Sequence, residues 1–201
     1  PIRFFKNNQG TFKEDTKQVF KSDQNGWWFS IEKGDFDNDG DQDLVVGNLR
    51  TNYKYQASVE KPFSIYLNDF DKNEVKDIVL SYSTGSEEYP VRGRQCSSEQ
   101  MPAIKKKFKN YDAFASASLK DIYTDQMLDN SLKYEIKSFK SIYLENNDGK
   151  FIAKPLPMEA QYSNINAFVV KDFDSDGNLD LVIGGNLYNA EVETPRNDAS
   201  Y

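Results

Sequence analysis

The 201-residue sequence contains no histidine and a single cysteine, Cys96. The absence of histidine removes the usual general base of enzymes and the commonest ligand of transition metals. One cysteine excludes an intrachain disulfide and a cysteine-based zinc cluster. We identify no catalytic residue and no organic cofactor site in the sequence.

Long apolar runs are also missing. No stretch approaches the roughly 18 apolar residues that a membrane-spanning helix needs, and no signal peptide is visible. The sequence opens on Pro1 rather than Met, so we expect a piece of a longer protein and give the missing signal no weight. The composition, 38% hydrophobic and 28% charged, is typical of a soluble globular chain.

The net charge of -7 argues against a nucleic-acid partner, because phosphates are neutralised by clustered Lys and Arg. Much of the negative charge is local, since residues 35–43 hold five Asp side chains. These carboxylates repel one another unless a cation lies among them or water solvates them fully. We interpret the acidity as a capacity to bind metal rather than as a repulsive surface.

Residues 35–43 place Asp at positions 1, 3, 5, 7 and 9 of a short loop. Carboxylates at positions 1, 3, 5 and 9, with the carbonyl of position 7, are the hard oxygen ligands of Ca²⁺, and Gly40 permits a left-handed turn. A helix-loop-helix calcium site does not fit, because position 12 is Val46 instead of Glu. The flanks, residues 27–31 and 44–46, have the composition of strands. A solvated polar turn is the alternative.

This loop recurs. A near copy occupies residues 172–180, and a weaker copy occupies residues 69–77, each beginning Asp-Phe-Asp and followed by an apolar strand. Residues 4–12 also match residues 143–151, where Asn-Asn-x-Gly separates two apolar segments and predicts a hairpin. Each unit, 4–48 and 143–186, thus holds a hairpin, a third strand, the loop and a fourth strand, the size of one propeller blade.

The middle unit has no Asn-Asn-x-Gly hairpin, and residues 51–57 and 88–91 are its candidate outer strands. Residues 95–133 show helical spacing of apolar side chains and predict a helical insertion. Its lysines, within residues 105–109, form either a basic patch for an anionic partner or a solvated helix face. Strand alternation places Trp27, Phe29 and Ile31 on one face, which favours packing between blades over a sugar-stacking surface.

The loops and the Asp-Leu-Val-x-Gly strands that follow them resemble the FG-GAP and VCBS repeats, a family that includes the integrin α-chain propeller. The Asn-Asn-x-Gly hairpin resembles the bacterial ASPIC/UnbV-type branch. The resemblance implies a calcium-stabilised β-propeller, commonly of seven blades, on exported or cell-surface proteins. It implies two Ca²⁺ sites and a third in the middle loop, where Glu74 replaces the turn glycine. The implied ligands are Asp35, Asp37, Asp39, Asp41 and Asp43; Asp69, Asp71, Asn73 and Asp77; and Asp172, Asp174, Asp176, Asn178 and Asp180.

We therefore predict an all-β partial propeller of about three four-stranded blades with a helical insertion. The expected segments are a blade at 1–50, a degenerate blade at 51–94, the insertion at 95–140, and a blade with the start of the next segment at 141–201. Two functions stay open. One is an extracellular or cell-envelope module for adhesion to a protein or glycan. The other is part of a polysaccharide lyase or glycosidase, with Glu60, Glu87 and Glu88 as candidate acids. We also expect self-association through the open ends of the partial propeller.

Overall fold

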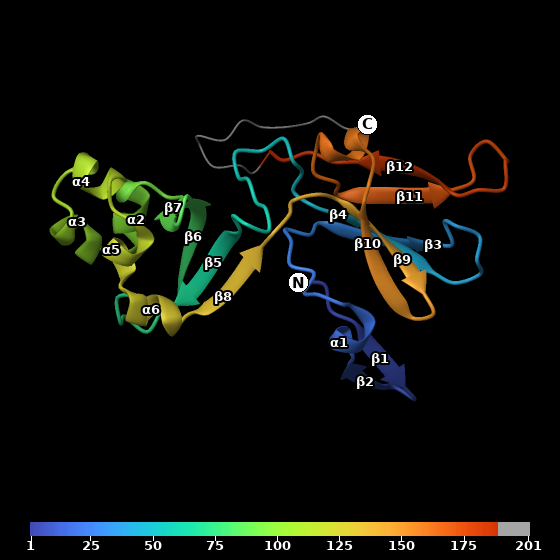
Figure 1. Cartoon of the computed structure of the whole chain (residues 1–201), viewed down its shortest axis with the longest axis horizontal. Helices are drawn as coiled ribbons and strands as arrows, with labels where there is room; N and C mark the ends of the chain where they lie inside the picture. The colour runs from blue at the N-terminus through green and yellow to red at the C-terminus, as the bar shows by residue number, and fades with distance from the viewer. Residues whose placement is uncertain (189–201) are drawn as a thin grey trace. The chain divides into compact units, whose positions relative to one another are not determined.

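A computed structural model describes residues 1–188 of the chain. The chain divides into two compact units (Figure 1). The first comprises Pro1–Lys54 and the described part of Phe139–Tyr201, and the second comprises the residues between them, Tyr55–Ser138. No helix in residues 1–188 is both long enough and apolar enough to cross a bilayer.

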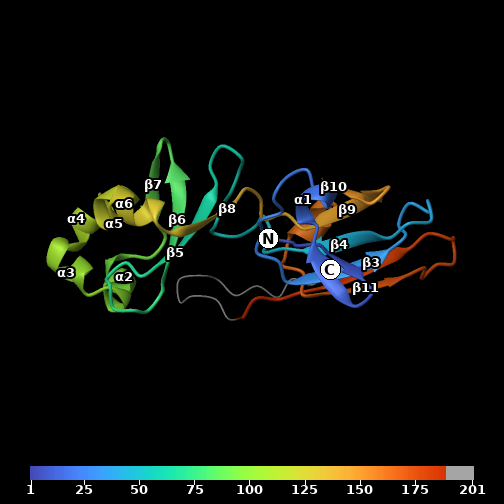
Figure 2. The same cartoon turned by 90° about the horizontal axis from the view of Figure 1, so that it is seen from below.

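The centre of the first unit is a four-stranded antiparallel sheet, in the order β10-β9-β4-β3. Strands from opposite ends of the sequence lie side by side in it, as the blue and orange ribbons show (Figures 1 and 2). The junction between them pairs Leu44 with Leu144 and Val45 with Tyr143. The four strands are β3 (Ser30–Gly34), β4 (Asp43–Gly47), β9 (Ile142–Asn147) and β10 (Lys150–Pro155).

This pairing corrects the predicted composition of a blade. The sequence repeat places each hairpin before its acidic loop, but the hairpin β9-β10 pairs with β4 of the preceding repeat. A structural blade is therefore a loop-bearing strand pair followed by the next hairpin. The second unit is inserted between β4 and β9, because β4 pairs directly with β9 although the chain leaves and returns between them.

Two short hairpins complete the first unit. Each forms a two-stranded sheet of its own among the described residues. The predicted hairpins at 4–12 and 143–151 are confirmed as β1-β2 and as β9-β10 of the central sheet. Their turns, at Gln9-Gly10 and Asp148-Gly149, have positive φ at both residues, as a type I′ hairpin turn requires. The elements are β1 (Phe5–Asn8), β2 (Thr11–Glu14), β11 (Ala167–Lys171) and β12 (Asp180–Gly184), with α1 (Thr16–Val19) and the 3-10 turn η1 (Met158–Gln161) between sheets.

Both faces of the central sheet are covered by apolar side chains. On one face, Val46 and Leu144 pack with Trp28 and with residues around α1. On the other, Val45 packs with residues around η1, against Leu181 and other partly buried side chains. The predicted use of Trp27, Phe29 and Ile31 as a core face is wrong. Trp28 enters the core, whereas Phe29 and Ile31 are 38% and 53% exposed, because the strand starts only at Ser30 and lies at the sheet edge.

The second unit contains another four-stranded antiparallel sheet, in the order β7-β6-β5-β8. The outer strand predicted at 88–91 is confirmed by β7, which begins and ends one residue earlier, whereas residues 51–57 form no strand. The fourth strand, β8, comes instead from beyond the helices and pairs with β5. The strands are β5 (Phe63–Asn68), β6 (Asp77–Thr84), β7 (Glu87–Pro90) and β8 (Leu132–Ile136).

Between β7 and β8 the chain forms five short helices, as the helical spacing of apolar side chains in residues 95–133 predicted. Their apolar side chains pack with Tyr66, Phe70 and Val79 of the sheet and its loop. Caps define several of them: Asn110 accepts from the N–H of Ala113, and Ser118 forms a capping box with Asp121. The helices are α2 (Arg94–Gln100), α3 (Ala103–Lys107), α4 (Tyr111–Ala115), α5 (Leu119–Tyr123) and α6 (Asp125–Asp129).

The fold class is confirmed in its broad form: a mostly β chain with four-stranded antiparallel sheets, acidic loops and a few helices, consistent with a partial β-propeller. The four predicted segments stay a prediction as domain bounds, although β8 lies inside the segment 95–140 and the pairing of β4 with β9 joins two of them. Residues 189–201 of the segment 141–201 lie outside the described residues.

The glycine that ends β4 provides a test of this packing. A Cβ at Gly47 would lie 2.3 Å from the backbone oxygen of Ile165 and 2.5 Å from Oγ of Ser30. We expect Gly47→Ala to lower the free energy of unfolding of the first unit by about 1–3 kcal/mol, because backbone cannot move aside as a side chain can. Gly184→Ala is the matched control, since Gly184 ends β12 in the same way but has open space around it. Denaturant titration that finds the two variants equally stable would contradict the packing.

Candidate metal sites

Each acidic loop joins two adjacent antiparallel strands. The first joins β3 to β4, the middle loop joins β5 to β6, and the third joins β11 to β12. Although their sequences differ, the three loops have one backbone shape. Position 4 has positive φ in all three (Asn38 60°, Lys72 61°, Ser175 65°), as does position 6 (Gly40 95°, Glu74 69°, Gly177 89°).

The carboxylate at position 1 shapes each loop from inside. In the first loop, Oδ1 of Asp35 accepts from the N–H of Asp39 at 3.1 Å and Oδ2 accepts from Gly40 at 3.1 Å. Asp69 and Asp172 accept from the corresponding two amides. Three loops with different side chains thus reproduce the same turn, which brings the next carboxylates over the loop centre.

The carboxylate at position 9 closes each loop. Asp43 Oδ2 accepts from the N–H of Phe36 at 3.0 Å, and Asp77 and Asp180 accept from Phe70 and Phe173 at 3.0 and 2.9 Å. The bond ties the first residue of the outgoing strand to the start of the loop. Position 9 therefore acts as a latch, whatever else it binds.

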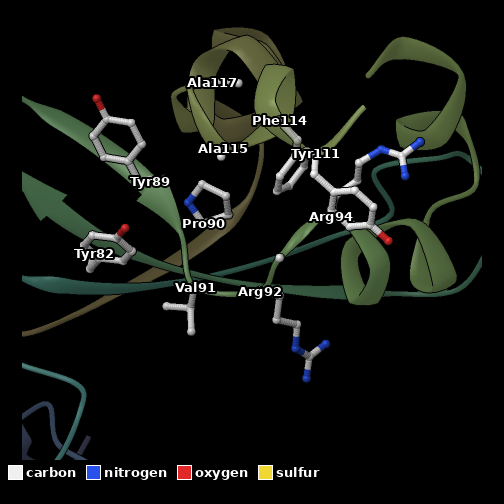
Figure 3. Close-up of a pocket in the computed structure, with 11 residues that line it drawn as sticks. Tyr82, Tyr89, Pro90, Val91, Arg92, Arg94, Tyr111, Phe114, Ala115 and Ala117 are labelled. Atoms are coloured by element: carbon white, nitrogen blue, oxygen red, sulfur yellow. The ribbon is translucent and has the colours of Figure 1, made fainter. Parts of the chain in front are cut away.

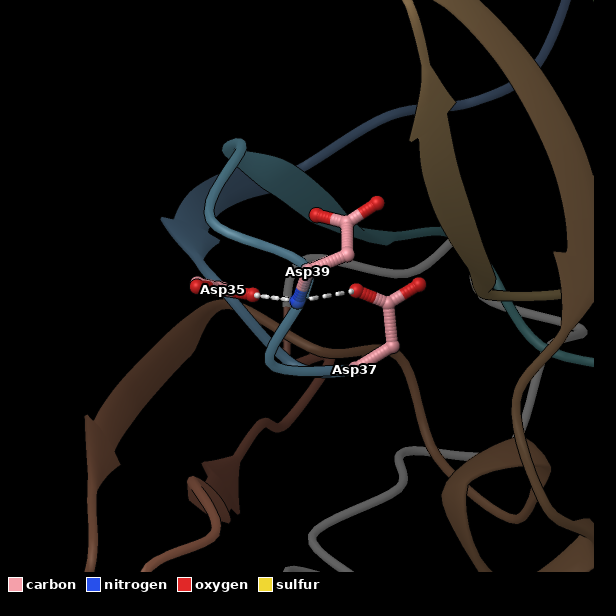
Figure 4. A group of neighbouring side chains, drawn as sticks. All are labelled: Asp35, Asp37 and Asp39. Atoms are coloured by element: carbon pink, nitrogen blue, oxygen red, sulfur yellow. Dashed lines mark hydrogen bonds between the residues drawn. The ribbon is translucent and has the colours of Figure 1, made fainter.

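Carboxylate oxygens converge in all three loops, and within each group the ligand atoms lie within 4.8 Å of one another. Figure 4 shows the first group, with the Asp39 amide bonded to both Asp35 and Asp37. The groups are Asp35, Asp37 and Asp39; Asp69, Asp71 and Asp77; and Asp172, Asp174 and Asp180. Among the predicted ligands, Asp41, Asp43 and Asp176 lie outside these groups. Oδ1 of Asn73 accepts from the N–H of Val75, and the N–H of Asn178 donates to Oδ1 of Asp176.

Asp43 lies outside the first group and accepts hydrogen bonds from several donors. It is fully buried. Its Oδ2 also accepts from the hydroxyl of Tyr143 at 2.8 Å, and its Oδ1 accepts from the N–H of Asn146 at 2.8 Å. Burial and these contacts with Asp43 raise the pKa of Tyr143, so its hydroxyl stays a donor. Asp43 connects the first loop to β9, a role that sequence spacing alone did not indicate.

Two carboxylate oxygens in the loops are enclosed without a hydrogen-bond donor, Oδ1 of Asp41 and Oδ1 of Asp71. A buried carboxylate oxygen without a donor is costly unless a cation satisfies it. Asp71 is position 3 of the middle loop and belongs to its carboxylate group. The residues of that loop therefore fit a hard cation, which favours oxygen ligands.

Charge repulsion is strongest in the first loop. Desolvation, followed by the neighbouring charge of Asp39, raises the pKa of Asp37 and of Asp41 above the ordinary value. In the third loop, hydrogen bonds from Asn178 lower the pKa of Asp176. Position 7 of the third loop is the uncharged Asn178, whereas in the first loop it is a fifth acid, Asp41.

The first and third loops are neighbours in the first unit. The side-chain amide of Asn38 donates to Oδ1 of Asn178 at 3.0 Å. Gly34 lets the loops approach, since a Cβ there would meet Cδ1 of Leu179 at 3.0 Å and the ring of Phe36 at 3.1 Å. The two candidate sites therefore lie on the same side of two adjacent sheets.

Arg92 and Arg94 border a cavity of about 300 Å³ that is lined largely by aromatic and apolar side chains (Figure 3). Their guanidinium groups point away from each other rather than towards a common point. Arg94 donates to the carbonyl oxygen of Phe108 at 2.6 Å and stacks on Tyr111. The pair therefore does not form an anion clamp.

The middle loop offers a test of loop strain. Glu74 occupies the left-handed position that Gly40 and Gly177 fill elsewhere. We expect Glu74→Gly to raise the free energy of unfolding of the second unit by about 1 kcal/mol. Glycine removes the cost of a left-handed L-residue, about 1–2 kcal/mol, but it also raises the entropy of the unfolded chain, which cancels part of this stabilisation. Chemical denaturation measures the change.

Two controls separate strain from charge. Glu74→Ala removes the carboxylate but keeps the Cβ, so it should gain less than Glu74→Gly. Lys76→Gly, in the same loop where the backbone is not left-handed, should destabilise. Equal stabilisation by Ala and Gly at position 74 would assign the effect to charge instead.

Comparison with known proteins agrees with this geometry. The model of the FG-GAP-like repeat family matches residues 1–46, which include β1 to β3, the first acidic loop and most of β4. No curated protein and no solved structure matched the chain. The narrower resemblance to the ASPIC/UnbV-type branch stays a prediction. Residues 1–46 therefore match an FG-GAP-like repeat, in agreement with the resemblance seen in the sequence.

Proposed function

We propose that the chain is a calcium-stabilised β-propeller module that binds a protein or carbohydrate partner outside the cell or in the cell envelope. The observation that carries the proposal is the convergence of three carboxylates in each of three loops with one backbone shape. The enclosed, donor-free oxygen of Asp71 supports it independently.

Calcium fits these loops better than other common ions. Every candidate ligand is a carboxylate or amide oxygen, which suits a hard cation, and the chain has no His to favour a transition metal. In the first loop the ion would be held by Asp35, Asp37 and Asp39, and in the third by Asp172, Asp174 and Asp180. The bound ion would supply positive charge where the carboxylates otherwise repel one another.

Binding of calcium would then be part of folding. The raised pKa of Asp37 and Asp41 reflects a loop in which ionised carboxylates are unfavourable. An ion that binds only the folded loop adds its binding free energy to the stability of the sheet. Calcium sites of moderate affinity fill readily where free calcium is abundant, which favours a location outside the cytosol.

The binding role follows from the family rather than from a ligand in the structure. FG-GAP repeats suggest a propeller-type module, and the scaffold that the loops stabilise leaves surface segments free to vary. A partner protein or glycan is therefore the proposed target. The enzymatic alternative stays a prediction. Its candidate acid Glu88 accepts from the hydroxyls of Tyr66 and Ser81 at 2.8 and 2.9 Å, which is a structural use of that carboxylate.

Thermal unfolding with added calcium or excess chelator tests the metal sites. A site whose dissociation constant is a hundredfold below the free calcium concentration adds about 2.7 kcal/mol of stability. We expect calcium to raise the Tm of the first unit, and Asp37→Ala with Asp174→Ala to abolish that rise. Asp71→Asn should abolish the response of the second unit alone.

The matched control is Asp148→Asn, which removes one carboxylate from an exposed hairpin turn and keeps a residue that tolerates its φ of 52°. The calcium response should survive in this variant. Direct titration calorimetry with Ca²⁺ and Mg²⁺ on the unmodified chain adds a readout that does not depend on unfolding. Absence of binding heat and of any Tm shift would refute the metal assignment and leave solvated turns.

A further inference from the structure

The second unit contains a cavity that lies outside the acidic loops. It has a volume of about 300 Å³, and its lining residues all lie between positions 82 and 117. That segment is in the middle of the chain, so neither end of the sequence bounds the cavity. Tyr82 and Tyr89 line it from the hairpin β6-β7, and Tyr111 and Phe114 line it from α4 (Figure 3). A concave site of this size suits a small ligand or a short stretch of a polymer.

Aromatic rings of the cavity are exposed to solvent. Tyr82 and Tyr89 are paired across β6 and β7, with ring centroids 6.2 Å apart and ring planes tilted by 32°. Tyr82 is 44% exposed and Tyr111 is 62% exposed. A tyrosine combines an apolar ring face with a hydroxyl group, so it can contact both the C–H face and the hydroxyls of a sugar ring. Three such side chains around one cavity favour a carbohydrate ligand.

The open edge of β7, beside the cavity, does not suit a peptide that adds to the sheet as a further strand. The N–H of Val91 donates to the carbonyl oxygen of Leu80 at 2.9 Å, so alternation turns the backbone groups of Glu88 and Pro90 to the open edge. Pro90 has no N–H, which leaves Glu88 as the one donor on that edge among the four residues of β7. The edge therefore argues against an extended peptide as the ligand.

Positive charge gathers in the segment that follows β7. Residues 92–109 contain six Lys or Arg and one acid, Glu99, although the whole chain has a net charge of -7. Lys105, Lys106 and Lys109 are exposed, and within residues 1–188 none of them forms an ion pair. Such a cluster on an acidic chain attracts an anion to this part of the surface.

Arg94 connects these lysines to the cavity. Its guanidinium group donates to the carbonyl oxygens of Phe108 at 2.6 Å and Lys109 at 3.4 Å, and it lies 5.2 Å from the ring centroid of Tyr111. Lys109 is therefore next to the aromatic wall that α4 supplies. The guanidinium groups of Arg92 and Arg94 point away from each other (Figure 3), which suits charges repeated along a chain better than one compact anion.

We propose that this cavity and the exposed lysines beside it bind an acidic polysaccharide, a chain of sugar rings that carry carboxylates. The sugar rings stack on Tyr82 and Tyr111, and the carboxylates lie against Lys105, Lys106 and Lys109. The inference rests on the proposed function and deepens it, because it names the class of glycan and the surface that binds it. A nucleic acid also combines rings with negative charge, but the net charge of -7 opposes it.

Titration calorimetry of the whole chain with short galacturonate oligomers tests the proposal. Free calcium is buffered at one value throughout, because carboxylates of the loops and of the oligomers both bind it. We expect saturable binding that weakens as the salt concentration rises. The methyl ester of the same oligomer keeps the sugar rings but lacks the charges, and it should bind about tenfold more weakly.

Removal of charge beside the cavity checks the role of the lysines. The triple variant Lys105→Gln, Lys106→Gln and Lys109→Gln should weaken the binding of galacturonate oligomers about tenfold, because each exposed charge pair contributes a fraction of this effect. Binding of the methyl ester should not change, since it has no carboxylate to lose a partner.

The matched control removes the same charge from the first unit. Lys6, Lys13 and Lys150 are exposed lysines on its two hairpins. The triple variant Lys6→Gln, Lys13→Gln and Lys150→Gln should bind galacturonate oligomers like the unmodified chain. A loss of affinity equal to that of the first triple variant would show that only net charge matters, and it would overturn the proposed site.

The tyrosines provide an independent set of variants. Tyr82→Ala and Tyr111→Ala should each weaken the binding of both the acid and its methyl ester about three- to tenfold, because both ligands lose a stacked ring. Phe12→Ala is the control, since Phe12 is an aromatic side chain of the first unit that is 66% exposed, and it should not change binding. Denaturant titration first verifies that each variant keeps the unfolding midpoint of its parent.

Calcium titration of the same samples separates this proposal from the metal assignment. Binding of calcium without binding of galacturonate oligomers would overturn the glycan site and leave the metal sites in place. Binding of the oligomers with the expected response of the variants, but without calcium binding, would support the glycan site and refute the metal assignment.

Two further outcomes would count against the proposal. Equal affinity for a polyglutamate peptide would assign this surface to acidic proteins rather than to glycans. Unchanged affinity for galacturonate oligomers in both the lysine variant and the tyrosine variants would place the bound glycan elsewhere on the chain.

Discussion

The hydrogen bond from the second residue of each acidic loop to the carboxylate nine positions into the loop is the interaction on which the rest depends. Asp43, Asp77 and Asp180 all accept this bond, at 2.9–3.0 Å, from a Phe amide. It holds the loop closed and ties the first residue of the outgoing strand to the start of the loop. In Asp43 and Asp77 the second oxygen also accepts from outside the loop, so the same group joins the loop to the rest of the sheet or to a helix.

This dual use explains why burial and charge coexist in the loops. Asp43 and Asp77 are almost completely buried, yet the oxygens of each accept hydrogen bonds from more than one donor, so burial leaves neither carboxylate without partners. The carboxylates at positions 1, 3 and 5 of the first loop differ. They lie close together and are more exposed, and desolvation, followed by the neighbouring charge of Asp39, raises the pKa of Asp37. The first loop therefore keeps its structural acid, Asp43, apart from its carboxylate group, whereas Asp77 and Asp180 both close their loops and belong to the carboxylate groups there.

The sequence predicted the acidic loops, the hairpin turns and the helical segment because each depends on local chemistry. Position 6 must be left-handed, and glycine marks it in two loops; Asn-Asn-x-Gly specifies a tight turn. The pairing of β4 with β9 was not predicted, because the two strands are separated by a long insertion. No local sequence pattern indicates to which sheet edge a hairpin will bind. β8 was missed for the same reason, as a strand that pairs with β5 from beyond five helices. The different roles of the carboxylates were not predicted, because position 9 is Asp in every loop. Only the hydrogen bonds from Tyr143 and Asn146 show that Asp43 joins the first loop to β9.

The offset between sequence repeat and structural sheet also has an architectural consequence. When a repeat donates its hairpin to the preceding loop-bearing pair, every unit in a row depends on its neighbour for two strands. A chain segment of two such repeats then completes one sheet and leaves a hairpin at one flank and a strand pair at the other. The inserted second unit does not relieve this, because it builds its own fourth strand, β8, and keeps its own latch satisfied through Gln100. Among residues 1–188, β12 pairs with β11 alone, whereas the corresponding outgoing strands β4 and β6 each lie between two neighbouring strands.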